Sequence, residues 1–345
     1  MPSSRAFVRR WQNVSGGNQS EAYRRIICVF ASIIICTRNR CAALKETLRA
    51  LDTVNVPAGR TVEVLVVDNG SSDGTQALLQ SARLAKFELR YVVEPTAGKS
   101  LACNTATRNA RGDILVWIDD DVRPHPNWLE EITKPIAEGR FDAVCGKVVI
   151  PPHLQRPWMT LQHLGWLACT DSIDPEAPRY AVGANMAFAK KILERVPEYD
   201  PELGPPGLGF YEDVLFTSQI KHAGYRLGMA SKGIVEHQFD VARLSRESFL
   251  KRAVGEGRSL AYVTWHWKHE RNSFPLLRSL KHKLMLQLNR IRRGKECGPE
   301  GLPLWELNLL VAASFHQQMS KECRRQRVYE QYGGRKLRVR GNASV

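Results

Sequence analysis

Residues 114–122 read Ile-Leu-Val-Trp-Ile-Asp-Asp-Asp-Val, an apolar run that ends in three carboxylates. The apolar part has the length and the β-branched content of a buried strand. Three like charges at the end of such a strand are unfavourable unless a cation compensates them, and carboxylate oxygens are preferred ligands of Mg²⁺ and Mn²⁺. A solvated acidic turn is the alternative, but Pro124 and Pro126 shape the exit, and we favour a metal site at these three carboxylates.

Outward from this stretch, segments rich in β-branched residues alternate with segments of helical periodicity. On the amino-terminal side we expect strands at 32–36, 62–67 and 89–93 and helices at 42–51, 75–85 and 100–110. On the other side follow an irregular Pro- and Trp-rich stretch (151–182), an apolar stretch (181–188), a Pro/Gly run (204–209) and a helix from about Glu212. This alternation predicts an α/β fold, a mostly parallel sheet flanked by helices, with ligands at the carboxyl ends of the strands.

A second polar segment, VVDNGSSDGT at residues 66–75, also follows a predicted strand and precedes a predicted helix. Glycine and small polar residues let the backbone approach a ligand, and the Asp68 carboxylate can accept a hydrogen bond from a base or a ribose. As a bare loop, the same residues form a turn and a helix cap through Asp73 or Thr75. Taken alone, the segment leaves both interpretations open.

The chain has 345 residues, enough for one large domain with extensions, and most of its formal charge of +15 lies at the two ends. Residues 1–25 hold 5 basic and 1 acidic side chains, residues 26–240 hold 23 and 26, and residues 241–345 hold 22 and 8. A nearly neutral middle segment does not fit a nucleic-acid groove, so no nucleic acid is expected as partner. We predict a basic amino-terminal extension (1–25), a catalytic domain (26–240) and a basic helical carboxyl-terminal region (241–345).

The eight cysteines form no C-x-x-C pair and no His/Cys run at zinc spacing, and several lie in apolar runs. Free thiols of this kind fit a reducing compartment. The run at 26–36 follows two arginines, as in a signal peptide, but it is too short to span a bilayer and lacks a small-residue cleavage site. We interpret the run as a buried strand and expect a cytoplasmic protein.

Four blocks in order resemble the family 2 glycosyltransferases with the GT-A fold, and the resemblance covers roughly residues 30–240. The blocks are Ile35-Cys36-Thr37-Arg38-Asn39-Arg40; Val67 to Thr75; the stretch from Gly98-Lys99 through Asn104, Arg108 and Gly112-Asp113 to the Asp119/Asp121 pair; and Gly183 to Phe188 followed by Glu212-Asp213. Any one block is weak, but the ordered set is specific. The resemblance implies an enzyme of hexosyltransferase type that uses a nucleotide sugar in polysaccharide or glycolipid biosynthesis.

The resemblance also implies which residues bind the donor. Thr37, Asn39 and Asp68 would line the nucleotide pocket, with Asp68 near the base. Lys99 would face the same cleft, and Asn185 would lie in a loop under the donor sugar.

The family's D-x-D pair falls on Asp119 and Asp121. The resemblance implies that Asp119 contacts ribose and metal and that Asp121 ligates the Mn²⁺ or Mg²⁺ directly, with Asp120 between them. His237 lies where some relatives supply a third metal ligand, although a lone histidine after a strand is also an ordinary structural residue.

Asp213 falls where the family places the catalytic base, and Glu212 is the neighbouring candidate. In a direct displacement the base deprotonates the acceptor hydroxyl on the face opposite the diphosphate, so that the anomeric configuration inverts. A metal would act as a Lewis acid on the leaving group. A carboxylate at a helix start can instead interact only with the helix dipole.

The chain lacks the Q-x-x-R-W sequence and the long membrane span that accompany processive synthases of this family, which implies transfer of a single sugar. The acceptor would be a hydroxyl of a glycan, a lipid-linked glycan or a small molecule. Alternatives are a nucleotidyltransferase on a similar sheet and an inactive relative that binds membrane or nucleic acid. The first gives no role to a late Glu-Asp pair, and Asp119, Asp121 and Asp213 argue against the second.

The basic carboxyl-terminal region contains an amphipathic helix signal. Its apolar stripe recurs at three- and four-residue steps and consists of Leu277, Leu280, Leu284, Leu288 and Ile291. The cations Lys281 and Arg292 flank the stripe, where long side chains can snorkel. Such a helix can attach peripherally to an anionic membrane surface on the inner membrane face, or it can dock its stripe on the domain. Because the region lies outside the resemblance, we expect nucleotide binding to survive its removal.

Overall fold

An eight-stranded sheet with strand order β3-β2-β1-β4-β7-β6-β8-β5 forms the centre of the computed structural model, which describes residues 30–294 and 299–336. The strands are β1 (Ala31–Thr37), β2 (Val62–Asp68), β3 (Glu88–Val93), β4 (Ile114–Ile118), β5 (Val122–Pro124), β6 (Ala143–Val149), β7 (Asn185–Ala189) and β8 (Leu227–His237). The strands β3, β2, β1 and β4 run parallel, whereas β7 is antiparallel to both β4 and β6. The predicted α/β sheet with helices on its faces is confirmed, and the antiparallel β7 makes it a mixed sheet.

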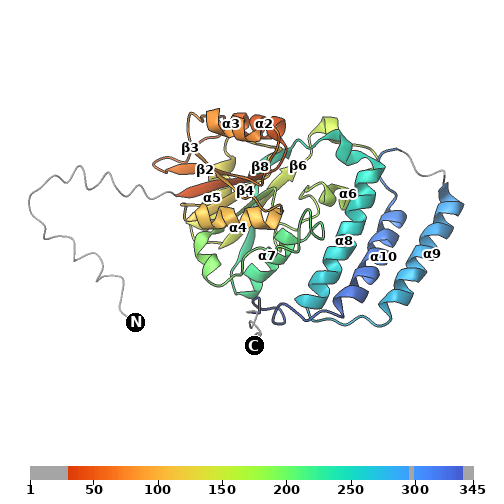
Figure 1. Ribbon diagram of the computed structural model, residues 1–345. Coiled ribbons are helices and arrows are strands. Elements are labelled where there is room, and N and C mark those ends of the chain that lie inside the picture. Colours follow the sequence, from red (N-terminus) through yellow and green to blue (C-terminus); the bar gives the residue numbers. More distant parts are fainter. Residues whose placement is uncertain (1–29, 295–298, 337–345) are drawn as a thin grey trace, which may run out of the picture.

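Helices cover both faces of the sheet, so the strands β1, β2 and β4 are buried along almost their whole length (Figure 1). One core lies under α2 (Cys41–Leu51), α3 (Thr75–Ser81) and α5 (Trp128–Ala137) and receives Ile33 and Ile35. The other lies under α4 (Lys99–Asn109) and α7 (Glu212–His222) and receives Ile34. Successive side chains of a strand point to opposite faces, so β1 contributes to both cores. Burial of each such isoleucine contributes about 1.5–3 kcal/mol.

The parallel register brings the polar strand ends to one edge of the sheet. Thr37 at the end of β1 pairs with Asp68 at the end of β2, and Ile35 pairs with Ile118, the last residue of β4. The carboxylates that follow β4 therefore lie beside the loop that follows β1, and the loop that follows β2 is the next one along the same edge. This is the edge at which ligands bind in open α/β sheets.

Beyond β8 the described residues contain helices and no further strand of the sheet. One short turn of 3-10 helix (Val241–Leu244) and three long helices follow in these residues, the long ones being α8 (Arg246–His266), α9 (Pro275–Arg293) and α10 (Leu304–Glu322). Figure 1 shows α8 beside the sheet domain, α10 next to it, and α9 outermost. The predicted helical character of this region is confirmed.

The carboxyl-terminal helices share cores with the sheet domain. One core joins Leu154 and Leu167 to Phe249 of α8 and Leu307 of α10. A second core joins the 203–215 segment to Tyr262, Trp267 and Tyr329. The predicted boundary near residue 240 therefore coincides with the end of the last strand and not with a break in the packing.

Part of the basic charge of this region serves the packing of its helices. Arg246 of α8 and Arg290 of α9 both pair with the buried carboxylate of Glu306 on α10, at 2.5 and 2.6 Å. Because Glu306 is completely buried, these pairs compensate a charge that would otherwise be costly. These cations hold the three helices together.

Two further expectations concern the compartment. The cysteines in the described ranges are free thiols, whereas Cys28 and Cys297 lie outside those ranges. No described helix combines the length and the apolar character needed to cross a bilayer. The segment 31–36 of the early apolar run is strand β1, as predicted, while residues 26–29 and the 1–25 extension lie outside the described residues.

Candidate active site

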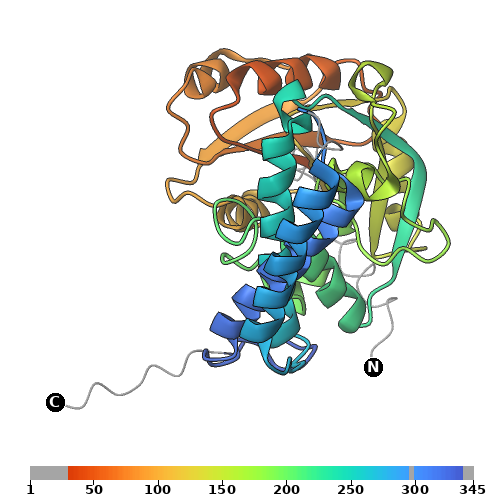
Figure 2. The same ribbon diagram turned by 90° about the vertical axis from the view of Figure 1, so that its right-hand side faces the viewer.

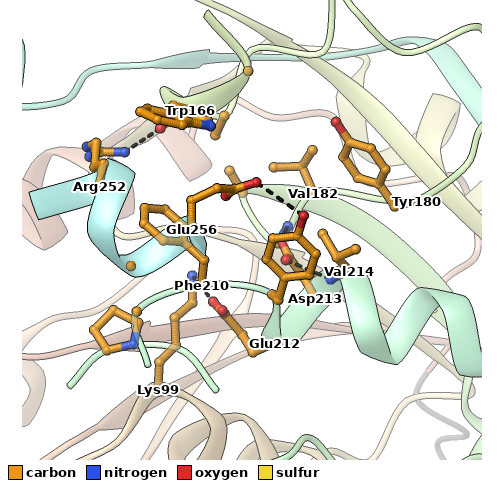
Figure 3. A pocket seen from close by; sticks show the side chains of 18 of the residues that line it. Lys99, Trp166, Tyr180, Val182, Phe210, Glu212, Asp213, Val214, Arg252 and Glu256 are labelled. Carbon is orange, nitrogen blue, oxygen red and sulfur yellow. Dashed lines mark hydrogen bonds and ion pairs between the residues drawn. The ribbon is translucent and has the colours of Figure 1, made fainter. Parts of the chain in front are cut away.

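A cleft of ≈ 1140 Å³ lies at the carboxyl edge of the sheet and is closed on one side by α8 (Figure 3). Its lining combines side chains of the predicted catalytic domain with side chains of the carboxyl-terminal region, namely Lys99, Asp119, Glu212 and Asp213 with Arg243, Arg252 and Glu256. The site therefore extends past the predicted boundary at residue 240.

Asp121 is a buried carboxylate surrounded by positive charge. Oδ2 accepts from Arg40 at 2.6 Å and from Arg243 at 3.3 Å, and Oδ1 lies 3.2 Å from Nε2 of His237. Burial by itself raises the pKa of Asp121, but His237, Arg40 and Arg243 together hold that pKa well below its ordinary value. Asp121 is therefore an anion, as a metal ligand must be.

A hydrogen bond of Nδ1, the ring nitrogen that does not face Asp121, fixes the orientation of His237. Nδ1 lies 2.7 Å from the carbonyl oxygen of Leu167, which can only accept, so Nδ1 carries the hydrogen. In the neutral ring, Nε2 then carries a lone pair, and this nitrogen lies 3.2 Å from Nη1 of Arg243 and 3.2 Å from Oδ1 of Asp121. His237 helps to lower the pKa of Asp121 only when Nε2 is protonated as well. An imidazole oriented by a backbone carbonyl is the usual arrangement of a metal-binding histidine.

Three side chains could hold a divalent cation here. Asp119, Asp121 and His237 offer ligand atoms that all lie within 4.8 Å of one another. Oδ1 of Asp121 is buried without a hydrogen-bond donor among the described residues, and its 3.2 Å separation from Nε2 fits adjacent ligands at about 2.1 Å around an octahedral ion. The residues present fit Mg²⁺ or Mn²⁺, and the structure brings all three predicted ligands together.

Asp120 has a different environment from its two neighbours. It accepts from the hydroxyl of Thr37 at 2.6 Å and pairs with Arg40 at 2.8 Å. Burial raises its pKa to about 6, against the opposing effect of Arg40. The sequence analysis placed the Thr37 hydroxyl in the nucleotide pocket. In the structure this hydroxyl donates its hydrogen bond to Asp120.

Lys99 connects the metal-binding side of the cleft with the beginning of α7. Its Nζ lies 3.4 Å from Oδ1 of Asp119 and 3.4 Å from Oε1 of Glu212. The two carboxylates raise the pKa of Lys99 well above its ordinary value, Asp119 most strongly, so the amine is a cation. Glu212 is buried, and burial raises its pKa to about 7.

Asp213 lies in the cleft next to Glu212 and is held by backbone donors. Oδ2 accepts from the N–H of Gly183 at 2.8 Å, and Oδ1 accepts from the N–H of Val214 at 2.8 Å. Burial raises the pKa of Asp213, while Lys99 and these N–H groups oppose the rise. A fixed carboxylate with a raised pKa meets the requirements of a general base.

The loops after β1 and β2 hold each other in place. Asn39 has a positive φ of 53°, and its amide oxygen accepts from the N–H of Ser72 at 2.7 Å. Asp68 is fully buried; Oδ1 accepts from the N–H of Ser71 at 3.0 Å, and Oδ2 has no donor among the described residues. Asp68 therefore keeps one acceptor that a ligand could use.

Asn185 is buried inside the sheet. Its amide nitrogen donates to the carbonyls of Lys147 and Gly233 at 2.9 and 2.8 Å, and its oxygen accepts from the indole of Trp128 at 2.9 Å. The amide group thus joins β7, β6, the β8 segment and α5. With its amide committed to these contacts, Asn185 is part of the scaffold, and we do not include it among the proposed donor contacts.

Several site residues were not found by sequence reasoning. Tyr211 has a positive φ of 75° immediately before α7, and its hydroxyl donates to Glu256 of α8 at 3.1 Å. Arg252 of α8 donates to the carbonyl of Trp166 (Figure 3), and burial together with Arg243 lowers its pKa to about 9. Arg40, which pairs with Asp120 and Asp121, was also not predicted as a site residue. Of these described residues, Arg40 alone had a local sequence signal, because it belongs to the polar block that follows β1.

Comparison with known proteins supports a relationship for part of the chain. Residues 32–196 match the family described as glycosyl transferase family 2. Glycosyltransferase AglE of Haloferax volcanii is 35% identical over 203 residues, which are 58% of this chain and 64% of that protein. The succinoglycan biosynthesis protein ExoM of Rhizobium meliloti is 34% identical over 115 residues, 33% of this chain and 37% of that protein. The chain thus covers less than two thirds of the length of these relatives.

Among solved structures, a mannosyltransferase from Pyrobaculum calidifontis in complex with GDP-Man and Mn²⁺ superposes with a TM-score of 0.51. The two chains are 20% identical, and the match covers 85% of this chain and 73% of that one. At this identity the likeness concerns the fold. The match covers 85% of this chain, which is more than the part up to the end of β8 at His237. The likeness in fold therefore extends into the carboxyl-terminal helices.

Proposed function

Residues 32–196 match glycosyl transferase family 2, and from this match we propose that the chain belongs to that family and transfers one sugar from a nucleotide-diphosphate sugar to an acceptor hydroxyl with inversion. The observation that carries the proposal is the arrangement within one cleft. The amine of Lys99 lies between Asp119 and Glu212. Asp119 belongs to the cluster with Asp121 and His237, and Glu212 is the chain neighbour of Asp213. The proposed base would therefore be separate from the proposed leaving-group site, as a single displacement requires.

The donor would bind on the side of Asp119. Asp119, Asp121 and His237 would hold a Mn²⁺ or Mg²⁺, and a bound divalent cation would neutralise the charge of the departing diphosphate. Lys99, a cation beside Asp119, adds a donor on the same side. The unpartnered oxygen of Asp68 would accept from the nucleoside. The solved complex of the Pyrobaculum calidifontis enzyme with GDP-Man and Mn²⁺ supports this class of donor.

The acceptor would bind on the side of α8. Asp213 would accept the proton of the attacking hydroxyl, and its raised pKa favours that transfer. The N–H groups of Gly183 and Val214 fix the carboxylate, so that it does not need to reorient during the reaction. Glu212 suits the role less well because it is buried against Lys99. The nucleotidyltransferase alternative leaves Asp213 without a task.

A glycan, a lipid-linked glycan or a small molecule remains the proposed class of acceptor. The name of the Rhizobium meliloti relative refers to biosynthesis of a polysaccharide. We propose polysaccharide or glycolipid biosynthesis as the context on that ground.

The proposal is tested by measuring turnover of uridine, guanosine and thymidine diphosphate sugars with and without Mn²⁺. We expect turnover with at least one donor and loss of that turnover with a chelator, restored by Mn²⁺ or Mg²⁺. Asp213→Asn should still bind the donor and lose about two or more orders of magnitude in rate, the scale of a general base. Glu212→Gln, the matched neighbour, should lose less. If the two variants exchange these effects, the base is Glu212; if neither affects turnover, the proposed reaction is wrong.

A further inference from the structure

The stripe of α9 is exposed to solvent. Its five members, Leu277, Leu280, Leu284, Leu288 and Ile291, have exposed fractions between 44% and 81%. Leu276 and Phe274 at the start of the helix are exposed as well. Monomeric proteins rarely expose a contiguous apolar surface of this kind without a partner. The alternative in which the stripe packs on the catalytic domain is therefore not what the described residues show.

The opposite face of α9 is the one that packs. The buried residues Ser279 and Leu286 face α10, and the hydroxyl of Ser279 donates to the carbonyl of Ala313 at 2.9 Å. His282 stacks on His316 of α10 at 5.2 Å between ring centroids. Since these residues lie half a turn from the stripe, α9 is fixed with its stripe turned away from α10. Figures 1 and 2 show α9 as the outermost helix of the molecule.

Charge around the stripe has a single sign. The helix contains six Lys and Arg residues and no Asp or Glu. On the helical period, Lys281 and Arg292 flank one edge of the stripe and Lys283 lies beyond the other. In the part of the chain that the structure describes, none of these three cations forms an ion pair, whereas Arg290 on the packed face does. The flanking cations are therefore available to an anionic partner.

From this arrangement we propose that the exposed face of α9 docks on an anionic lipid bilayer, with the stripe in the interface and Lys281, Lys283 and Arg292 on the headgroups. The helix has 19 residues and carries a narrow apolar stripe between cations, so it fits a position in the plane of the interface. A second copy of the chain fits less well. A symmetric contact would bring two sets of the same cations together without any carboxylate of α9 to pair with them.

The test is flotation of the full-length protein with vesicles of phosphatidylcholine alone and of phosphatidylcholine mixed with phosphatidylglycerol. The proposal expects binding to the anionic vesicles that weakens between about 0.1 M and about 1 M salt as charges become screened. Leu280→Glu with Leu284→Glu should reduce the bound fraction by about tenfold or more, because both side chains leave the interface. A variant that combines Lys281→Gln, Lys283→Gln and Arg292→Gln should bind the anionic vesicles more weakly. Its behaviour with vesicles of phosphatidylcholine alone should not change.

The matched control is Gln76→Glu with Gln80→Glu, which adds the same two negative charges to the exposed side of α3. This variant should float like the unchanged protein, and thermal melting should be the same for all variants because every changed side chain is on the surface. Three outcomes would overturn the proposal: no flotation of the unchanged protein, flotation of the Leu280/Leu284 variant at the original level, or conversion by that variant of a dimer into a monomer in the absence of lipid. Flotation needs no sugar donor, so its failure is separate from failure of the proposed reaction.

Discussion

At the scale of single residues, Glu256 has an unusual environment for a carboxylate, because it is buried beside a hydroxyl and no cation is among the causes that shift its pKa. It lies on α8, faces the cleft (Figure 3) and accepts from the hydroxyl of Tyr211. Burial raises its pKa from 4.5 to about 7, and the hydrogen bond of Tyr211 only partly opposes that rise. The side chain thus contributes a pH-dependent penalty to folding, because the unfolded chain loses the same proton near pH 4.5.

The sign of this effect gives a prediction. Between pH 4.5 and about 7 the native state holds more protons than the unfolded state, so the free energy of unfolding falls as pH rises. Glu256→Gln keeps an acceptor for Tyr211 and cannot ionise. The variant should be more stable than the unchanged protein at about pH 8, by on the order of 1–3 kcal/mol, and equal to it near pH 4. Urea unfolding at both pH values measures this difference.

Glu247 on the same helix is the control. It is exposed, and its hydrogen bond with Lys251 lowers its pKa. Glu247→Gln should therefore not produce the gain in stability at high pH. An equal effect of Glu256→Gln at both pH values would mean that Glu256 has the same pKa in the folded and the unfolded state.

The metal ligands permit a test that does not depend on turnover. Asp121→Asn removes a ligand from the cluster of Asp119, Asp121 and His237, and should weaken Mn²⁺ binding by about tenfold or more. Asp120→Asn is the matched neighbour, because Asp120 is engaged by Thr37 and Arg40 and is not a member of the cluster. Its effect on the dissociation constant should be smaller. Calorimetric titration with Mn²⁺ measures both, and equal affinities in both variants would exclude Asp121 as a ligand.

At the scale of elements, the contact between α8 and α10 places α8 against the cleft. Gly257 lies where the two helices touch, and a Cβ atom there would meet the carbonyl oxygen of Val311 at 2.3 Å and the nitrogen of Phe315 at 2.8 Å. Backbone atoms cannot move aside as a side chain can. The position therefore requires glycine for close packing, although glycine lowers intrinsic helix propensity.

Gly257→Ala should consequently destabilise the protein by about 1–3 kcal/mol, the usual cost of overpacking. Gly294→Ala at the end of α9 is the control, since a Cβ there meets nothing within 4 Å. The first variant should lower the midpoint of thermal unfolding by several degrees, and the second should not. Equal melting of both variants would show that α8 and α10 can separate without cost.

At the scale of the whole molecule, the carboxyl-terminal helices complete two cores of the sheet domain. Sequence reasoning expected that nucleotide binding would survive removal of this region. Ending the chain after residue 240 would strip Phe249 and Leu307 from one core and Tyr262 from another. Each such loss costs about 2–5 kcal/mol, which together exceeds the margin of a typical domain. We therefore predict, against that expectation, that the sheet domain does not keep its fold without the carboxyl-terminal helices.

The truncated chain should accordingly show no cooperative thermal unfolding and no donor binding by calorimetry. A chain ending at residue 336, which keeps every described element, should retain both. Donor binding by the shorter chain at the original affinity would show that the sheet domain folds by itself and that α8 is not needed for the site.

The sequence by itself determined the parallel half of the sheet and the placement of its polar ends. A buried strand in a parallel sheet contains a continuous apolar run that can be recognised locally. The carboxylates of Asp68 and Asp119 come directly after the apolar runs 64–67 and 114–118. Because parallel strands end at one edge, the cluster around Asp119 and Asp121 could be placed without knowledge of the remaining packing.

Only the tertiary structure decided what surrounds these carboxylates and which side of each late helix is covered. Arg243 contacts Asp121 from 122 residues away, and the tautomer of His237 depends on a carbonyl 70 residues away. An amphipathic pattern predicts that α9 has an apolar face but not what that face meets. Here Ser279 and Leu286 are buried against α10, and the more apolar side is left exposed. Such contacts join residues that are far apart in the sequence and depend on how whole helices and strands pack on one another. A local sequence pattern does not contain that information.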